Sequence, residues 1–243
     1  MRMLEDKDSQ WLEFLPVYSF LAVISLQYLV CGKVDEDHQR PVLPSSLDVK
    51  NAFEKHKIIS DGLISRAPDR FMVVKFRNNS TVELGNFLTF DEAWEIPGFI
   101  YWDADPGCIH TLIFLNIDHP NEFFPKKRQY LQWLVGNIPE ARVENGRILS
   151  SYLMPIPPPV QYGIHRLLFL AYKQPRTTIE FSEPFLPALP LPKSRANWTL
   201  AEFVNKYDLI GPVAGNFYQI NWQEEGSNLK DDKSPKIENK ISL

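Results

Sequence analysis

The chain has 243 residues, of which 44% are hydrophobic and 13% aromatic, and its formal net charge is −4. This length supports one good hydrophobic core or at most two small ones, and the negative charge argues against a nucleic-acid partner, which requires a basic face. Two cysteines, and five histidines without metal-ligand spacing, indicate neither a disulfide framework nor a metal site. We expect no cofactor.

The amino-terminal segment contains 18 residues without a charge, "FLPVYSFLAVISLQYLVC" at 14–31. As a helix this run is about 27 Å long, just short of a bilayer core. A secretory signal peptide, a single-span anchor and a buried helix all fit it, but the run is not amphipathic and an acidic stretch follows. We therefore interpret residues 1–32 as a signal peptide or membrane anchor. The protein is expected to be secreted, with anchoring through residues 14–31 as the alternative.

The predicted folded unit spans residues 44–222, and most of its elements are strands. Apolar or alternating runs at 70–76, 111–117, 130–137, 166–172 and 217–222 predict strands. In the last run Phe217, Gln219 and Asn221 alternate with Tyr218, Ile220 and Trp222, so the two sets face opposite sides of a sheet.

The sequence predicts short helices in two segments and no regular element at the carboxyl terminus. Residues 46–56 place Val49 and Phe53 on one stripe, and residues 199–207 carry apolar side chains at helical spacing behind a capping box of Thr199 and Glu202. The polar residues 223–243 predict a disordered tail. Many strands, few helices and no βαβ alternation predict a mostly β fold, a large antiparallel β-sandwich or barrel with a few short helices.

Polar residues interrupt the apolar strands at three places. Asn116, Asp118 and His119 end the 111–117 run, Gln132 lies inside the 130–137 run, and His165-Arg166 opens the 166–172 run. In one interpretation Asp118 and Arg166 form a structural ion pair while His165 bonds a loop carbonyl. In the other, His165 lies in a small polar cleft that receives an anion. A hydrolase built on Asp118, His165 and Ser150 or Ser151 lacks a nucleophile motif, so we expect no enzyme activity.

Several blocks, in order and spacing, resemble the phosphatidylethanolamine-binding protein (PEBP) family. They are "WDADPG" (102–107), "NIDHP" (116–120), "WLVGNIP" (133–139), "PPVQYGIHRLLFLAYKQ" (158–174) and "KYDLIGPVAGNFYQINW" (206–222). The segment at 52–68 is similar to insect members. The resemblance covers about residues 44–222 and implies a large antiparallel sandwich with a small anion pocket at its surface.

The resemblance also implies which residues line that pocket. Asn116 stands where an acid is usual in the family, Gln132 where a histidine is usual and Leu167 where a tyrosine is usual, so the pocket is partly degraded. Within it, the resemblance and strand alternation predict that His165 faces the anion and that Arg166 pairs with Asp118. The full set of implied ligand-binding residues is Asn116, Asp118, Pro120, Gln132, Pro159, Gly163, His165 and Tyr218.

The function that the resemblance implies is binding without catalysis. The expected ligand is small and anionic or lipidic, such as a phospholipid head group. The alternative is a protein-interaction or inhibitor domain that acts on a kinase or protease. The expected partners are therefore a small anionic or lipid ligand and a possible protein, with membrane association possible only through residues 14–31.

Overall fold

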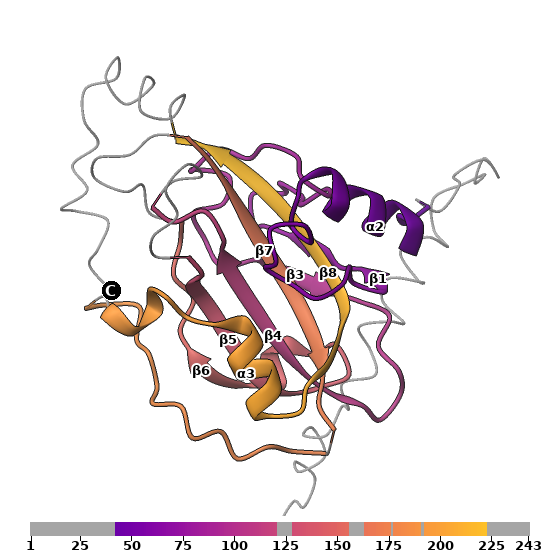
Figure 1. The fold of residues 1–243 in the computed structure, drawn as a ribbon, viewed down its shortest axis with the longest axis vertical. Helices are drawn as coiled ribbons and strands as arrows, with labels where there is room; N and C mark the ends of the chain where they lie inside the picture. Colours follow the sequence, from indigo (N-terminus) through magenta and orange to yellow (C-terminus); the bar gives the residue numbers. More distant parts are fainter. Residues whose placement is uncertain (1–41, 121–127, 156–162, 176, 191, 223–243) are drawn as a thin grey trace, which may run out of the picture. The chain divides into compact units, whose positions relative to one another are not determined.

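The computed structural model describes residues 42–120, 128–155, 163–175, 177–190 and 192–222, and these form a mostly β unit with two α-helices (Figure 1). The predicted signal or anchor segment, the tail and Pro159 lie outside the described residues. Within the described part, no helix combines the length and the apolar character that a membrane span requires.

The main sheet has six strands in the order β1-β8-β7-β4-β5-β6. Its strands are β1 (Arg70–Phe71), β4 (Ile109–Asn116), β5 (Tyr130–Pro139), β6 (Arg147–Ser150), β7 (Ile164–Lys173) and β8 (Ile210–Asn221). A second sheet pairs β2 (Val73–Lys75) with β3 (Phe99–Tyr101). The pairs are antiparallel except for β1 with β8, which is parallel. The predicted antiparallel sandwich is thus confirmed, with one parallel pair at its edge.

The run 70–76 does not form the single strand that its composition predicts. Phe71 pairs with Gly215 in the main sheet, whereas Val73 already pairs with Tyr101 in the second. The chain changes sheets at Met72, whose side chain is fully buried. The amide of Asn216 donates to the carbonyls of Met72 and Val82, which fixes this crossing between the two sheets.

Helix α2 (Ser46–Lys55) forms where the sequence predicts it. Ser45 caps it, because its hydroxyl accepts from Asp48 N at 3.2 Å and its N–H donates to the Asp48 carboxylate at 2.8 Å. Val49 and Phe53, one turn apart, are fully buried. The helix is therefore held both by its cap and by its apolar stripe.

Helix α3 (Leu200–Lys206) also forms, but the predicted capping box at Thr199 is wrong, because the Thr199 side chain makes no capping bond. Instead the side-chain oxygen of Gln129 accepts from Leu200 N at 2.8 Å. The acceptor for the first N–H of the helix therefore comes from a residue 71 positions away in sequence. A local sequence pattern cannot reveal such a partner. The short 3-10 turns η1 (Val143–Asn145) and η2 (Lys193–Arg195) complete the described elements.

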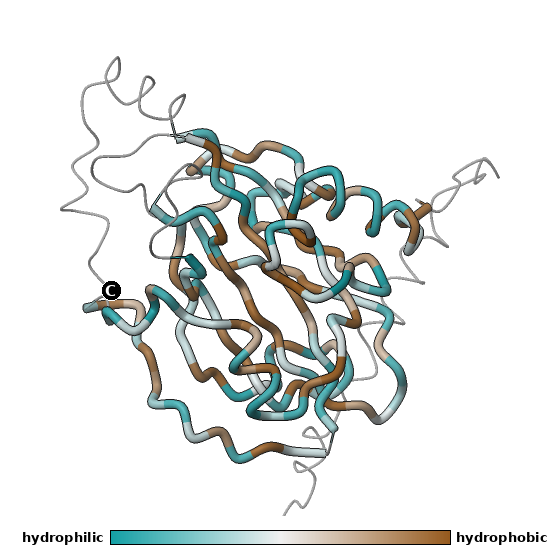
Figure 2. The backbone as a smooth tube through the Cα atoms, in the orientation of Figure 1, coloured by the Kyte–Doolittle hydropathy of each residue, from teal (hydrophilic) through white to brown (hydrophobic). Residues whose placement is uncertain are grey.

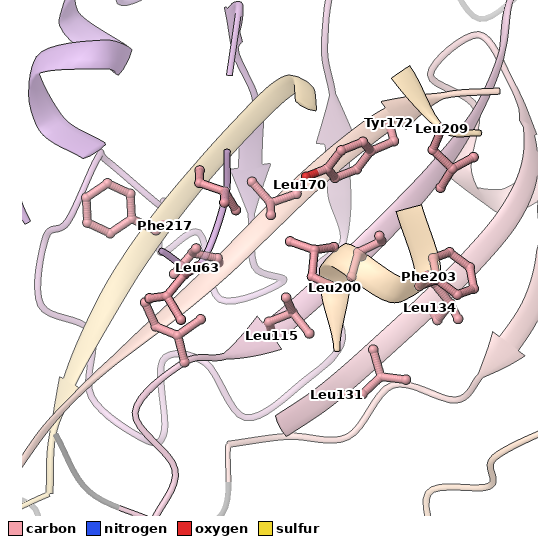
Figure 3. Close-up of a cluster of buried hydrophobic side chains, with 14 of the residues drawn as sticks. Leu63, Leu115, Leu131, Leu134, Leu170, Tyr172, Leu200, Phe203, Leu209 and Phe217 are labelled. Carbon is pink, nitrogen blue, oxygen red and sulfur yellow. The ribbon is translucent and has the colours of Figure 1, made fainter. Parts of the chain in front are cut away.

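The main sheet separates two apolar cores. On one face, apolar residues of α2 and α3 pack against alternate strand residues such as Leu115, Leu170 and Phe217. Figure 3 shows Leu200 and Phe203 of α3 in this cluster. On the other face, Phe114, Phe169 and Tyr218 pack toward β2. The central strands accordingly form brown, apolar stretches of the tube (Figure 2). Phe217 and Tyr218 lie in different cores, as the predicted alternation of β8 requires.

Candidate functional site: the polar end of β4 and β7

The polar residues that end β4 lie beside those that begin β7, because the two strands pair antiparallel and Asn116 is opposite Leu167. Asn116, Asp118 and His165 are all buried, and Pro120 is half-buried at the edge of the group. The structure therefore brings four of the predicted site residues together. We refer to Asn116, Pro120 and His165 as the histidine site.

His165 is held by a hydrogen bond at each ring nitrogen. Its Nε2 lies 3.2 Å from the carbonyl oxygen of Pro120, which can only accept, so this nitrogen carries the proton. Its Nδ1 lies 3.0 Å from the amide nitrogen of Asn116 and accepts from it. The Asn116 oxygen in turn accepts from Asp118 N at 3.0 Å. This chain of bonds fixes one tautomer of a neutral imidazole.

The surroundings of His165 also favour the neutral form. Burial lowers the pKa of His165 to about 4, outweighing the nearby Asp118 charge and the Pro120 bond, which favour protonation. The imidazole is therefore uncharged near neutral pH. The ring also makes an edge contact with Trp222, at 6.2 Å between centroids.

Asp118 and Arg166 form the predicted ion pair, on the other side of the strand end. Arg166 Nη2 lies 2.7 Å from Asp118 Oδ1, and Arg166 Nε lies 2.8 Å from Oδ2. Arg128 adds a bond from Nη2 to Asp118 Oδ1 at 3.3 Å. Burial by itself would lower the pKa of Arg166, but the carboxylates of Asp118 and Asp61 outweigh this effect and raise it. Arg128 and Asp61 were not predicted, since neither interrupts an apolar run.

Gln132 and Tyr218, also predicted for the pocket, have different surroundings. Phe114 pairs with Trp133 and Leu115 with Leu131, so Gln132 is the extra residue of a β-bulge. Its side-chain oxygen is buried and has no hydrogen-bond partner among the described residues. Tyr218 is fully buried, its hydroxyl has no partner in the described part of the chain, and burial raises its pKa. No bond links either side chain to the histidine site within the described residues.

Gly163 lies next to the site through its backbone. Its carbonyl accepts from Trp222 N at 3.0 Å, and its φ of 136° is a conformation that favours glycine. Gly163 thus ties the end of β8 to the start of β7.

Arg195 supports the Gln132 bulge and was not predicted. This guanidinium is fully buried, and burial lowers its pKa. The acceptors that it contacts are backbone carbonyls of Leu131, Gln132, Ser151, Leu186 and Pro187. One side chain therefore joins β5 to the segments that follow β6 and β7.

A groove of about 610 Å³ lies at the opposite end of β5, beside Glu140. Trp102 and Trp133 contribute to its walls, and Phe99, Tyr101 and Ile148 at its border are about half exposed. Nothing in the sequence pattern pointed to it.

Within the described residues, no cluster of histidine, cysteine, aspartate and glutamate side chains could hold a metal ion. Cys108, which the structure describes, is a free thiol.

No protein-family model matches the chain, but individual proteins do. It is 30% identical over 177 residues, 73% of this chain and 82% of the relative, to a Drosophila melanogaster protein named as odorant-binding protein A5. It is 34% identical over 166 residues to the 26 kDa secreted antigen of Toxocara canis, covering 66% of this chain and 62% of the antigen, less than two thirds of its length.

Solved structures share the fold. A carboxypeptidase Y inhibitor in complex with its cognate proteinase aligns with a TM-score of 0.59 at 20% identity, over 72% of this chain and 96% of that one. The phosphatidylethanolamine-binding protein of Plasmodium vivax aligns with a TM-score of 0.57 at 18% identity, over 74% and 98% of the two chains. At these identities the likeness concerns the fold alone.

The names of these similar proteins refer to odorant binding, phosphatidylethanolamine binding, carboxypeptidase Y inhibition and a secreted antigen. The chain belongs to the phosphatidylethanolamine-binding protein family.

Proposed function

We propose that the chain is a secreted, non-enzymatic binding protein that takes a small anionic or lipid ligand, such as a phospholipid head group, at the histidine site. The observation that carries this proposal is the meeting of the buried side chains of Asn116 and His165 with the half-buried Pro120 at one strand end. The names of the odorant-binding relative and of the phosphatidylethanolamine-binding neighbour support a ligand of this class. The secreted antigen supports secretion.

The state of His165 limits how such a ligand binds. A phosphate oxygen that reaches Nε2 has to replace the Pro120 carbonyl as the acceptor of its proton, so one hydrogen bond is exchanged for another. Because the imidazole is neutral, it adds no positive charge to this bond. We therefore expect modest affinity for the head group, with most binding free energy supplied by the apolar part of a lipid.

Calorimetric titration with phosphoethanolamine tests this function. The His165→Leu variant should bind at least about tenfold more weakly than the wild type, because leucine has no N–H to donate to the ligand. His110→Leu is the matched control, since His110 is equally buried but lies at the other end of β4. Equal affinity of the two variants would refute binding at His165.

A second candidate is a protein-interaction or inhibitor domain that acts on a protease or kinase. Exposed apolar side chains favour it, namely Phe99, Tyr101 and Ile148 around the groove beside Glu140. Affinity capture from the natural secretion separates the two candidates. Recovery of lipid supports the histidine site, whereas recovery of a stoichiometric protease or kinase, lost in Phe99→Ser, supports the second candidate.

A further inference from the structure

Two arginines converge at the surface beside the histidine site, and a buried carboxylate holds both in place. The Asp118 side chain is 1% exposed and accepts from Arg166 and from Arg128. Each arginine also donates to a backbone carbonyl, Arg166 to His56 and Arg128 to Ile117. The two guanidinium groups are thus fixed by partners that do not move with a ligand.

A second carboxylate faces both arginines from the solvent side. Asp61 Oδ2 lies 3.0 Å from Arg166 Nη2 and 3.7 Å from Arg128 Nη2. The Asp61 side chain is 29% exposed, in contrast to Asp118. It belongs to the turn that follows α2, between Lys57 and Gly62, which both have positive φ. One oxygen of a surface loop therefore lies where two N–H donors converge.

The charges show which carboxylate is replaceable. Asp118 neutralises one of the two arginines and accepts four hydrogen bonds, one of them from the backbone of Arg166. The remaining positive charge is met by Asp61 alone among the described residues that pair with these arginines. An oxyanion that takes the place of the Asp61 carboxylate keeps the charge balanced and retains both donors.

We propose that Arg128 and Arg166 form an anion subsite for a phosphate group, and that Asp61 is its resident internal anion. The subsite is separate from the histidine site. His165 contacts Trp222 of one core, whereas Arg166 reaches His56 and Asp61 beyond α2 on the other face of the sheet. Phosphate and Asp61 compete for the same two guanidinium groups, so Asp61 lowers the affinity of the wild-type chain for phosphate.

Titration with inorganic phosphate tests the subsite directly. Asp61→Asn should raise phosphate affinity at least about tenfold, because it removes a like charge from the subsite. Adding Arg128→Gln to Asp61→Asn should abolish the gain. Asp69→Asn is the matched control, since Asp69 is a surface acid paired with Arg66 outside the cluster, and it should leave affinity unchanged. An equal gain in Asp69→Asn, or none in Asp61→Asn, would overturn the proposal.

A second measurement applies if Asp61→Asn fails to fold. Phosphate should raise the melting temperature of the wild-type chain, and Arg128→Gln should remove that increase; an unchanged increase would overturn the subsite. Flotation with phosphatidylcholine vesicles, with and without phosphatidic acid, identifies the source of the phosphate. Binding that depends on phosphatidic acid and on Arg128 supports a lipid phosphate, and calorimetric binding without flotation supports a free one. Absence of both would contradict the subsite, while leaving the His165 titration to decide the histidine site.

Discussion

Arg166 binds Asp118 through three of its own nitrogens. Its backbone N–H donates to Asp118 Oδ2 at 2.9 Å, Nε donates to the same oxygen at 2.8 Å, and Nη2 donates to Oδ1 at 2.7 Å. Arg166 thus holds Asp118 in place, two residues before the Pro120 carbonyl that His165 contacts.

Removing one partner of this pair should be costly. Arg166→Ala leaves a carboxylate that is 1% exposed with Arg128 as its remaining charged partner, and we expect a loss of about 3–5 kcal/mol in the free energy of unfolding. The check is urea denaturation, with Arg66→Ala as the control, because the Arg66–Asp69 pair is about half exposed and should contribute less than about 1 kcal/mol. Similar losses in both variants would contradict the structural role of the pair.

His165 should make stability depend on pH. Its pKa is about 4 in the folded chain and 6.5 when unperturbed. Between these values the unfolded chain takes up a proton that the folded chain does not, so stability falls as pH falls from 6.5 to about 4 and then levels off. The difference corresponds to roughly 3 kcal/mol.

The His165→Gln variant isolates this effect. His56 and His110 also have lowered pKa values, mainly through burial, and their contribution is common to both proteins. The stability advantage of the wild type at pH 7 should therefore shrink by roughly 3 kcal/mol at pH 4. A constant difference in unfolding free energy across this range would show that His165 does not titrate as described.

Asn116 should control the charge of His165. Asn116→Asp replaces the amide that donates to Nδ1 with a carboxylate that can only accept, which favours the imidazolium. We expect the pKa of His165, followed by NMR of the ring, to rise above about 4. Asn78→Asp, at an exposed position, should leave it unchanged. An unchanged pKa of His165 in the Asn116→Asp variant would contradict the chain of hydrogen bonds.

Arg195 should contribute strongly to the stability of the fold. Arg195→Met removes bonds to five carbonyls, and we expect a loss of at least about 3 kcal/mol in unfolding free energy. Arg195→Lys should not restore it, because an ammonium cannot reproduce the planar fork. Arg147→Met, at an exposed position of β6, should change stability by less than about 0.5 kcal/mol. Full rescue by lysine would show that charge alone matters.

Much of the fold follows from local pattern in the sequence. The buried strands β4, β5 and β7 form where apolar runs predict them, and helix α2 forms where the stripe of Val49 and Phe53 predicts it. The short strands β3 and β6 were missed, because three or four residues with exposed positions carry too little periodicity. The division of residues 70–76 between two sheets depends on Asn216, far away in sequence.

The site was predictable only where polar residues interrupt apolar strands. That signal identified Asn116, Asp118, His165 and Arg166, which the structure brings together. It could not identify Asp61, which lies in a polar turn, because its contact with Arg166 spans 105 residues. The neutral state of His165 was equally hidden, since it results from burial in the folded chain.

The most direct test of the central claim is an NMR titration of the wild-type chain with phosphoethanolamine. If the histidine site binds the head group, the His165 ring signals and the backbone amides of Asp118 and Gly163 should shift together in a saturable way. Saturable shifts confined to other parts of the chain, or no shifts at all, would contradict the account.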